Sequence, residues 1–504
     1  MVAIIAYLGC TGEPTEPSGK NLQRNIILIT VDALRADAVG YMNSIPDRSP
    51  ALDRISQESV VFTQAIASSV STTASMASMM TGRYPNFEDV DEWQPWNFYG
   101  FSDFAPVEEK EKPGLTSNVM MLAEIFGASG YHTVGFNTNP FLNKFSNFHQ
   151  GFEKYFQFRP YLRSMKKLRT HRMIGRYPPA PIVISSVLRW LGKNQDERPL
   201  FLWIHLMEPH SPYLPDNNGE AANSLASGLS DLEINDALYG LLFTQQGNEE
   251  LAAEYPRPEE LGVDTKTVVH DALRLYNDEI SFFDRELSKL VAELKSNGLW
   301  QSSTVMITSD HGEEFLDHGF VTHHFKSAIA EELIRVPLLV KPPEGETFEP
   351  GQRVESVVRM IDFAPTLLDY AGIKEDSYAD AHMDGTSLRT LVEGHHSEDR
   401  TAFISTVEWG IVRNSEWKYR LEKPRKTARE ASERLFAIRD DPMEESDVAN
   451  EYPGELAKMR EQFERFSTAL KNRQGSGSSD VARPESTLSE DDRERLEALG
   501  YFQD

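Results

Sequence analysis

Two apolar runs, far apart in the chain, each end in an aspartate, and this feature limits the possible folds more than any other. Residues 24–33 are RNIILITVDA and end at Asp32, and residues 302–312 are SSTVMITSDHG, with Asp310 at the same relative place. A continuous β-rich apolar run is typical of a strand buried on both faces of a sheet. Such strands belong to sheets covered by helices on both sides.

Helical patterns alternate with these strands. Apolar side chains recur at helical spacing through residues 268–298, where Asn297-Gly298 marks the end of the helix. A helical stretch followed by an apolar strand also occurs in residues 120–139 and 183–210. This alternation predicts an α/β fold with a large, mostly parallel sheet sandwiched by helices.

Changes in composition and in predicted secondary structure divide the chain into segments. Residues 24–394 form the large α/β domain, and within them residues 214–262, which are acidic and rich in Asn, Gly, Ser and Glu, are interpreted as a surface insertion or lid. Residues 395–473 predict a smaller C-terminal subdomain with an antiparallel sheet and a helix. Residues 474–504 predict a flexible linker and a short terminal helix.

The first 23 residues carry the one cysteine of the chain, Cys10, after the short apolar run MVAIIAYLG and before a polar stretch. This arrangement looks like the end of a bacterial lipoprotein signal, and chance resemblance is the alternative. The apolar run is too short to span a bilayer. We therefore predict export to the cell envelope, as a periplasmic or surface lipoprotein attached to the membrane through lipidated Cys10.

The formal net charge of −27 argues against nucleic acid or an anionic lipid surface as the main partner, since both need a basic face. A small anionic substrate is still compatible with this charge, because a bound metal can attract it locally.

Ligands of open α/β sheets bind beyond the carboxyl ends of the strands, where Asp32 and Asp310-His311 are expected. Two carboxylates and an imidazole there suit a hard or borderline divalent cation. Each aspartate alone could instead cap a turn or a helix; the three together favour a metal.

Hydroxyl side chains open a predicted helix in residues 69–85, SVSTTASMASMMTGRYP. The free N–H groups at a helix start bind phosphate or sulfate well. Ser71, Thr72 or Thr73 could cap this helix. One of them could also attack a metal-activated ester.

Basic side chains cluster in residues 203–215, where one predicted strand ends, and in residues 317–326, shortly after Asp310-His311. A histidine there could protonate a leaving oxygen, and Lys or His could hold non-bridging oxygens. The candidates are His205, His210, His318, His323, His324 and Lys326.

Taken in this order, the segments resemble the sulfatase family of the alkaline-phosphatase superfamily, over roughly residues 24–502. The matching text includes NIILITVDALRAD, SMASMMTGRYP, LFLWIHLMEPHSPYLP and, as the most specific block, ITSDHGEEFLDHG followed by EELIRVPLLVKPP. The resemblance implies an alkaline-phosphatase-like catalytic domain over residues 24–394. It also implies an enzyme that hydrolyses sulfate or phosphate esters with one divalent metal ion, Ca, Mn, Mg or Zn.

The chain departs from the family signature, which begins Cys (or Ser)-x-Pro-x-Arg and has Thr-Gly nine residues after its first position. Counting back from Thr81 places Thr72 at the nucleophile, Ala74 at the proline and Met76 at the arginine. Family members usually have a second aspartate after the first strand, and this chain has Ala33 at that position. Classical members oxidise the Cys or Ser to formylglycine, and threonine cannot become an aldehyde by that route. Threonine here resembles the phospho-transferring relatives, in which it forms a phosphothreonine.

Carried over position by position, the resemblance implies two overlapping sets of residues. The metal ligands would be Asp32, Asp310, His311 and Thr72. The catalytic residues would be Thr72, His210, His323 and Lys326. Ser71 or Thr73 replaces Thr72 if the helix register shifts by one, and His324 or Lys326 is the alternative to His323.

Three functions compete on these grounds. Hydrolysis of a phosphate or sulfate ester is favoured, with phosphoester cleavage preferred because of Thr72. The alternatives are a phosphoglycerol- or phosphoethanolamine-type transferase and a catalytically silent binding protein, the latter suggested by Ala33, Ala74 and Met76. The substrate would be a small anionic ester, on a glycan or lipid, with specificity expected in residues 86–115 and in the 214–262 insertion. The aromatic side chains Trp93, Trp96, Tyr99 and Phe101 could line a sugar or lipid site, and packing in the interior is the alternative.

Overall fold

The computed structural model describes most of the chain between residues 24 and 474. The described ranges are 24–43, 48–85, 119–144, 146–158, 178–215, 225–323, 329–395, 400–406, 408–424 and 431–474. The predictions for Cys10, for the aromatic residues of 86–115, for His324 and Lys326, and for the terminal linker therefore lie outside the described residues.

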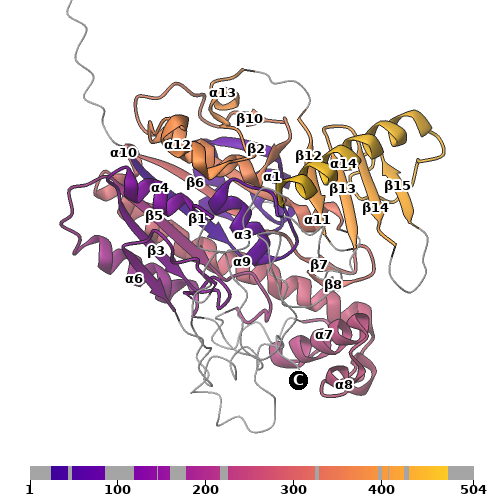
Figure 1. Cartoon of the computed structure of the whole chain (residues 1–504). Helices are drawn as coiled ribbons and strands as arrows, with labels where there is room; N and C mark the ends of the chain where they lie inside the picture. Colours follow the sequence, from indigo (N-terminus) through magenta and orange to yellow (C-terminus); the bar gives the residue numbers. More distant parts are fainter. Residues whose placement is uncertain are drawn as a thin grey trace, which may run out of the picture.

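A nine-stranded sheet forms the centre of the molecule (Figure 1). Its strands run in the order β10 (Arg353–Val354), β2 (Val60–Ile66), β9 (Arg335–Lys341), β6 (Ser303–Ser309), β1 (Asn25–Val31), β5 (Leu200–Leu206), β3 (His132–Asn137) and β4 (Lys154–Gln157), and β11 (Val358–Arg359) also pairs with β2. Strand β9 is antiparallel to both neighbours, and the other described pairs are parallel. The predicted mostly parallel sheet is confirmed.

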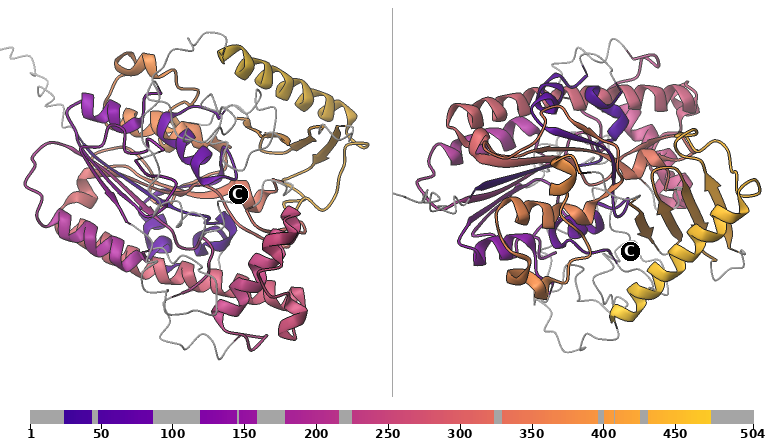
Figure 2. Two further views of the ribbon diagram at one scale, coloured as in Figure 1. Left: turned by 60° about the horizontal axis from the view of Figure 1, so that its bottom comes forward. Right: turned by 90° about the horizontal axis from the view of Figure 1, so that it is seen from above.

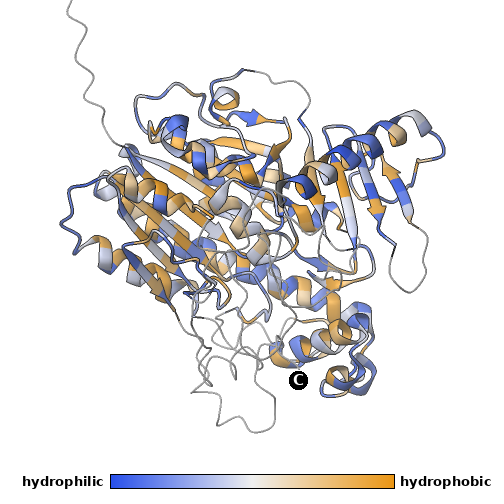
Figure 3. Cartoon of the chain, viewed as in Figure 1, coloured by the Kyte–Doolittle hydropathy of each residue, from blue (hydrophilic) through white to orange (hydrophobic). Residues whose placement is uncertain are grey.

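Helices cover both faces of this sheet, which explains why its central strands carry apolar side chains on both sides (Figure 2). Ile27 and Ile29 of β1 pack on the side of α6 (Ala180–Leu191) and α9 (Thr265–Ser296). The intervening Ile26 and Leu28 lie in a second cluster, with side chains of α3 (Thr72–Thr81), α4 (Leu122–Ala128) and α12 (Phe363–Tyr370). Figure 3 shows that most of the central strands are hydrophobic.

The register of the central strands decides where the polar residues emerge. Val31 is paired with Ser309 of β6 and with Leu206 of β5, so these parallel strands end together. Asp32 and Asp310, one residue further on, therefore leave the sheet side by side at its carboxyl edge.

The segment interpreted as an insertion is helical in its described part. It contains α7 (Asp231–Gln246), α8 (Glu249–Ala252) and the 3₁₀ turn η3 (Pro258–Leu261). Ile234, Ala237 and Leu238 of α7 are buried in the same cluster as the apolar face of α9. The acidic composition of this segment thus reflects its outer surface.

The C-terminal subdomain is the predicted antiparallel sheet with a helix. Strands β12 (Ala402–Ser405), β13 (Trp409–Arg413), β14 (Lys418–Glu422) and β15 (Ser432–Phe436) pair in sequence order, and α14 (Pro453–Gln474) crosses them (Figure 1). Within the described residues, no helix combines the length and the apolar character needed to cross a membrane.

A buried ion-pair network joins this subdomain to the large domain. Glu331 opens the short helix α11 (Glu331–Ile334) and lies 3.1 Å from Arg413 Nη2 and 3.6 Å from Lys418 Nζ. Lys418 is also 2.6 Å from Glu444. Burial alone would raise the pKa of Glu331, but Arg413 and Lys418 outweigh it and lower the pKa to about 2.

Glu331→Gln is expected to lower the free energy of unfolding at pH 7 by about 3 kcal/mol, because the buried Arg413 loses the carboxylate it pairs with and Lys418 loses one of its two. The folded pKa of Glu331 is below its ordinary value of 4.5. Its contribution is therefore complete above that pH and fades as the pH falls from about 4.5 toward 2. Denaturant unfolding of wild type and variant should give curves that converge over this range. The exposed variant Glu355→Gln is the control, and a constant difference at all pH values would contradict the assignment.

Candidate metal and catalytic site

Three metal-type side chains meet at the carboxyl edge of the sheet. Asp32 follows β1, and Asp310 and His311 follow β6; all three are fully buried. One ligand atom from each lies within 4.8 Å of the others. The structure thus brings together three of the four predicted metal ligands, and the fourth lies beside them.

Each carboxylate uses one oxygen for contacts within the protein. Asp32 Oδ2 accepts a hydrogen bond of 2.7 Å from the Asn139 side chain and lies 3.2 Å from His205 Nε2. Asp310 Oδ1 accepts backbone N–H bonds of 3.1 Å from Ala33 and 2.9 Å from His311. These contacts hold both carboxylates in one orientation.

The other carboxylate oxygens, Asp32 Oδ1 and Asp310 Oδ2, are buried and have no hydrogen-bond partner among the described residues. They lie 3.7 and 3.5 Å from His311 Nε2. His311 Nδ1 is 2.8 Å from the Gly312 carbonyl, which can only accept, so Nδ1 donates there and, in the neutral imidazole, Nε2 carries a lone pair. Buried polar atoms without partners need an explanation, and lone pairs from two carboxylates and an imidazole fit a divalent cation.

The electrostatics of the cluster also suit a cation. Burial would raise the pKa of Asp32, but the imidazoles of His210, His205 and His311 together lower it. Burial and the neighbouring Asp32 raise the pKa of Asp310. Two carboxylates at this separation oppose each other's ionisation, and a bound cation would offset that repulsion.

Thr72 is the first residue of α3, after the extended N-cap residue Ser71. Its Oγ1 lies 3.2 Å from His311 Nε2, and the residue is 7% exposed. No comparable hydrogen bond to the cluster from Ser71 or Thr73 is found in the described part of the chain. The helix start therefore directs one of the three candidate hydroxyls at the metal-type residues.

The two predicted catalytic histidines lie together beside the cluster. The ring centroids of His210 and His323 are 4.9 Å apart, and those of His323 and His311 are 4.3 Å apart. Burial lowers the pKa of His210, and burial together with His311 lowers the pKa of His323 to about 3. His318, a neighbour in sequence, instead contacts Glu332 and the Met443 carbonyl.

Two further residues of the site, Glu313 and Asn139, are not among those predicted from the sequence. Glu313 is fully buried; its Oε1 lies 2.9 Å from His323 Nδ1, and its Oε2 accepts a 3.0 Å hydrogen bond from the Tyr213 hydroxyl. Burial raises the pKa of Glu313 to about 7. A glutamate directly after Asp-His-Gly at a strand end was the available signal, as was an asparagine beyond the carboxyl end of β3.

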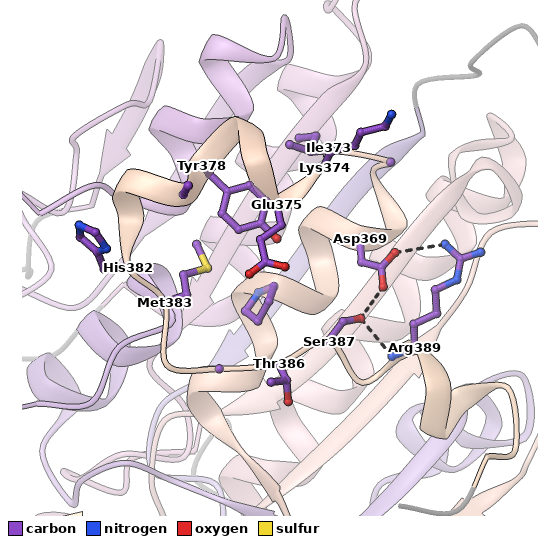
Figure 4. Close-up of a pocket in the computed structure, with 14 residues that line it drawn as sticks. Asp369, Ile373, Lys374, Glu375, Tyr378, His382, Met383, Thr386, Ser387 and Arg389 are labelled. Carbon is purple, nitrogen blue, oxygen red and sulfur yellow. Dashed lines mark hydrogen bonds and ion pairs between the residues drawn. The ribbon is translucent and has the colours of Figure 1, made fainter. Parts of the chain in front are cut away.

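A separate hollow of about 660 Å³ lies between α12 and the 3₁₀ segment η5 (Glu375–Ala381), lined among others by His382 and Met383 (Figure 4). Asp369 at its rim is held by Ser387 and Arg389. None of the predicted site residues lines this hollow, so its size assigns no chemistry.

Comparison with known proteins places the chain in a family. Residues 24–373 match the family model described as Sulfatase, and residues 317–469 match that described as N-sulphoglucosamine sulphohydrolase, C-terminal. The chain therefore belongs to the sulfatase family, as its sequence motifs imply. It is a sulfatase-like hydrolase that acts on ester bonds.

Similar proteins are distant but cover most of the chain. An ulvan-active sulfatase from Formosa agariphila is 25% identical over 413 residues, which are 78% of this chain and 69% of the relative. An arylsulfatase from Clostridium perfringens is 22% identical, with 85% and 91% covered.

Solved structures share the fold at still lower identity. A protein in complex with its substrate D-glucosamine-2-N,6-O-disulfate has a TM-score of 0.64 at 17% identity, covering 89% of this chain and 98% of its own. A phosphonate monoester hydrolase of Agrobacterium radiobacter has a TM-score of 0.62 at 18% identity, with 89% and 96% covered. These likenesses confirm the alkaline-phosphatase type of fold.

Proposed function

We propose that this protein hydrolyses phosphate esters with Thr72 as the nucleophile, at a site where Asp32, Asp310, His311 and Thr72 hold one divalent metal ion. The observation that carries the proposal is the 3.2 Å approach of Thr72 Oγ1 to His311 Nε2, beside two buried carboxylate oxygens that have no described partner. A hydroxyl in that position is both a ligand and a nucleophile.

The chemistry of threonine favours phosphate over sulfate. A formylglycine hydrate can expel sulfate by returning to the aldehyde, and a threonine ester has no such route. A phosphothreonine can instead be cleaved by water at phosphorus. The presence of threonine at position 72, nine residues before Thr81, therefore supports a phosphoester substrate, although the family is named for sulfate esters.

A bound metal would supply positive charge that lowers the pKa of the hydroxyl beside it and attracts an anionic ester. The start of α3 adds backbone N–H groups and the positive end of the helix dipole to the binding of the transferred group. Both features explain how a chain of net charge −27 can bind an anion at this edge.

The reaction would proceed in two displacements. The Thr72 oxygen, having lost its proton to solvent, forms a bond to phosphorus while the bond to the ester oxygen breaks. His210 or His323 gives that leaving oxygen a proton. Water, losing a proton to the same imidazole, then attacks the phosphothreonine and releases phosphate and Thr72. The negative charge of the substrate counteracts the lowered pKa of these imidazoles and favours their protonated form.

Glu313 would orient His323 through the 2.9 Å contact with Nδ1, as a buried carboxylate orients an imidazole in hydrolytic triads. Glu313→Gln is expected to lower kcat about 100-fold for an alkyl ester, which needs a proton on its leaving oxygen. A nitrophenyl ester should lose much less. Plots of rate against leaving-group pKa would show the difference, and Tyr213→Phe, which removes one hydrogen bond to Glu313, should give a smaller change. An equal loss for both esters would mean that Glu313 acts on folding or metal binding alone.

A sulfate ester, including one on a glycan, is the second candidate, because the similar proteins are named sulfatases and one was solved with a disulfated glucosamine. The test compares nitrophenyl sulfate, phosphate monoester and phosphate diester, with Mn²⁺, Ca²⁺, Mg²⁺ or Zn²⁺ added to purified protein. Phosphoester cleavage that Thr72→Ala abolishes supports the proposal. Sulfate cleavage alone would overturn it, and product transfer to an added glycerol acceptor would favour the transferase.

A further inference from the structure

A second group of metal-type side chains lies apart from the site described above. Glu314 lies on the short strand β7 (Glu314–Phe315), which pairs with β8 (Val321–Thr322); His318 lies between these strands, and Glu332 is on α11. One ligand atom from each lies within 4.8 Å of the others. The two groups have no residue in common.

Glu314 is fully buried and only half satisfied. Its Oε1 accepts backbone N–H bonds of 2.9 Å from His318 and 3.1 Å from Phe320. Its Oε2 is buried with no hydrogen-bond partner in the described part of the chain. Burial, and then the charge of Glu332, raise the pKa of Glu314 to about 7. An unmet carboxylate oxygen in the interior is costly, so a positive ligand at Oε2 would remove a real penalty.

His318 is oriented for binding through Nδ1. Its Nε2 lies 3.0 Å from the Met443 carbonyl, which can only accept, so Nε2 carries a proton and donates it. Nδ1 lies 2.6 Å from Glu332 Oε1, and the His318 side chain is 15% exposed. A histidine whose other ring nitrogen donates to a backbone carbonyl has the arrangement typical of metal-bound histidines.

An ion pair between His318 and Glu332 would satisfy those two residues only. It would leave Glu314 Oε2 unmet and two carboxylates close together. A divalent cation would contact all three groups at once, and the partly exposed edge of His318 gives it a way in.

We propose that Glu314, His318 and Glu332 bind a second divalent cation of the Zn²⁺ type, with a structural role. One imidazole and two carboxylates are ligands that Zn²⁺ accepts readily. The cation would tie the β7–β8 hairpin to α11 and, through the contact of His318 with Met443, to the C-terminal subdomain. This site does not depend on the reaction proposed above.

The test removes the first site and asks whether zinc still binds. Full-length Asp310→Asn protein is stripped with a chelator, reloaded with Zn²⁺ and assayed for metal per chain and for Tm. It should retain one Zn²⁺ and show a rise in Tm on loading. Asp310→Asn/Glu314→Gln should bind Zn²⁺ at least tenfold more weakly and show no rise, whereas Asp310→Asn/Glu355→Gln should behave as its parent.

Asp310→Asn/Glu332→Gln repeats the test at a second ligand, in case Glu314→Gln impairs folding. Circular dichroism of the zinc-free variants checks that they are folded. Absence of bound Zn²⁺ in Asp310→Asn would overturn the proposal. Equal zinc binding by Asp310→Asn and Asp310→Asn/Glu314→Gln would also overturn it. In that case, a higher Tm of the zinc-free double variant would show that the two glutamates share a proton instead.

Discussion

Replacing Thr72 by alanine is expected to lower kcat for an aryl phosphate by at least about 1,000-fold, because the chain loses the atom that attacks phosphorus. Thr72→Ser should keep a measurable part of the activity, since the hydroxyl remains. Thr72 is buried at the start of α3, and serine lacks the methyl group that restricts the side-chain rotamer, so part of the loss in the serine variant will come from a less ordered hydroxyl. Steady-state kinetics on the purified variants would measure both effects.

Ser71→Ala and Thr73→Ala are matched controls, because they remove neighbouring hydroxyls from the same helix start. We expect each to change kcat less than tenfold. Mass spectrometry of protein quenched in acid during turnover should find a phosphate on Thr72. Phosphate on Ser71 or Thr73, or full activity in Thr72→Ala, would contradict the choice of nucleophile.

Asp310→Asn is expected to abolish activity and metal binding at the catalytic site, and at the same time to stabilise the metal-free protein. Asparagine keeps an oxygen for the backbone N–H groups of Ala33 and His311. It also replaces the buried Asp310 Oδ2, which has no described partner, by an N–H donor close to Asp32. The variant has one negative charge in place of two that repel each other, so the Tm of the metal-free variant should exceed that of metal-free wild type by ~2 °C or more.

Activity assays, metal analysis and thermal unfolding of the chelated proteins test the three parts of this expectation. In wild type, chelation should abolish turnover, and added Mn²⁺, Ca²⁺, Mg²⁺ or Zn²⁺ should restore it for the metal that the site prefers. Glu355→Gln controls for the loss of a negative charge at an exposed position. A lower Tm for metal-free Asp310→Asn would mean that the carboxylate pair is not a source of repulsion in the folded protein.

Much of the architecture follows from the sequence. The apolar runs that end at Asp32 and Asp310 are buried on both faces, and alternate residues of β1 enter the two opposite clusters. The helices of residues 214–262 were harder to predict, because the amphipathic pattern of α7 is weak and its buried Ile234 and Leu238 lie among polar residues. Its packing on α9, a tertiary contact, makes that helix stable.

Some residues of the candidate site could likewise be predicted from the sequence, and others could not. The sequence could place Asp32, Asp310 and His311 together because they lie within two residues of a strand end, and parallel strands in one register end at one edge of the sheet. Glu313 and Asn139 could not, because their importance lies in what they contact. Glu313 is held by His323, across the β7–β8 hairpin, and by Tyr213, which is distant in sequence; Asn139 is placed by its contact with the equally distant Asp32.

The sequence by itself determined the fold class, the family and the strand ends where charged side chains gather, because these depend on local pattern and on the burial of whole strands. Only the tertiary structure decided which hydroxyl of the 71–73 run comes within hydrogen-bond distance of His311, and that Glu314, His318 and Glu332 form a second cluster. The physical reason is that hydrogen bonding and metal ligation depend on distances of a few ångströms between residues on different elements of the fold. Such distances arise only when the sheet, the helices and the C-terminal subdomain have packed together.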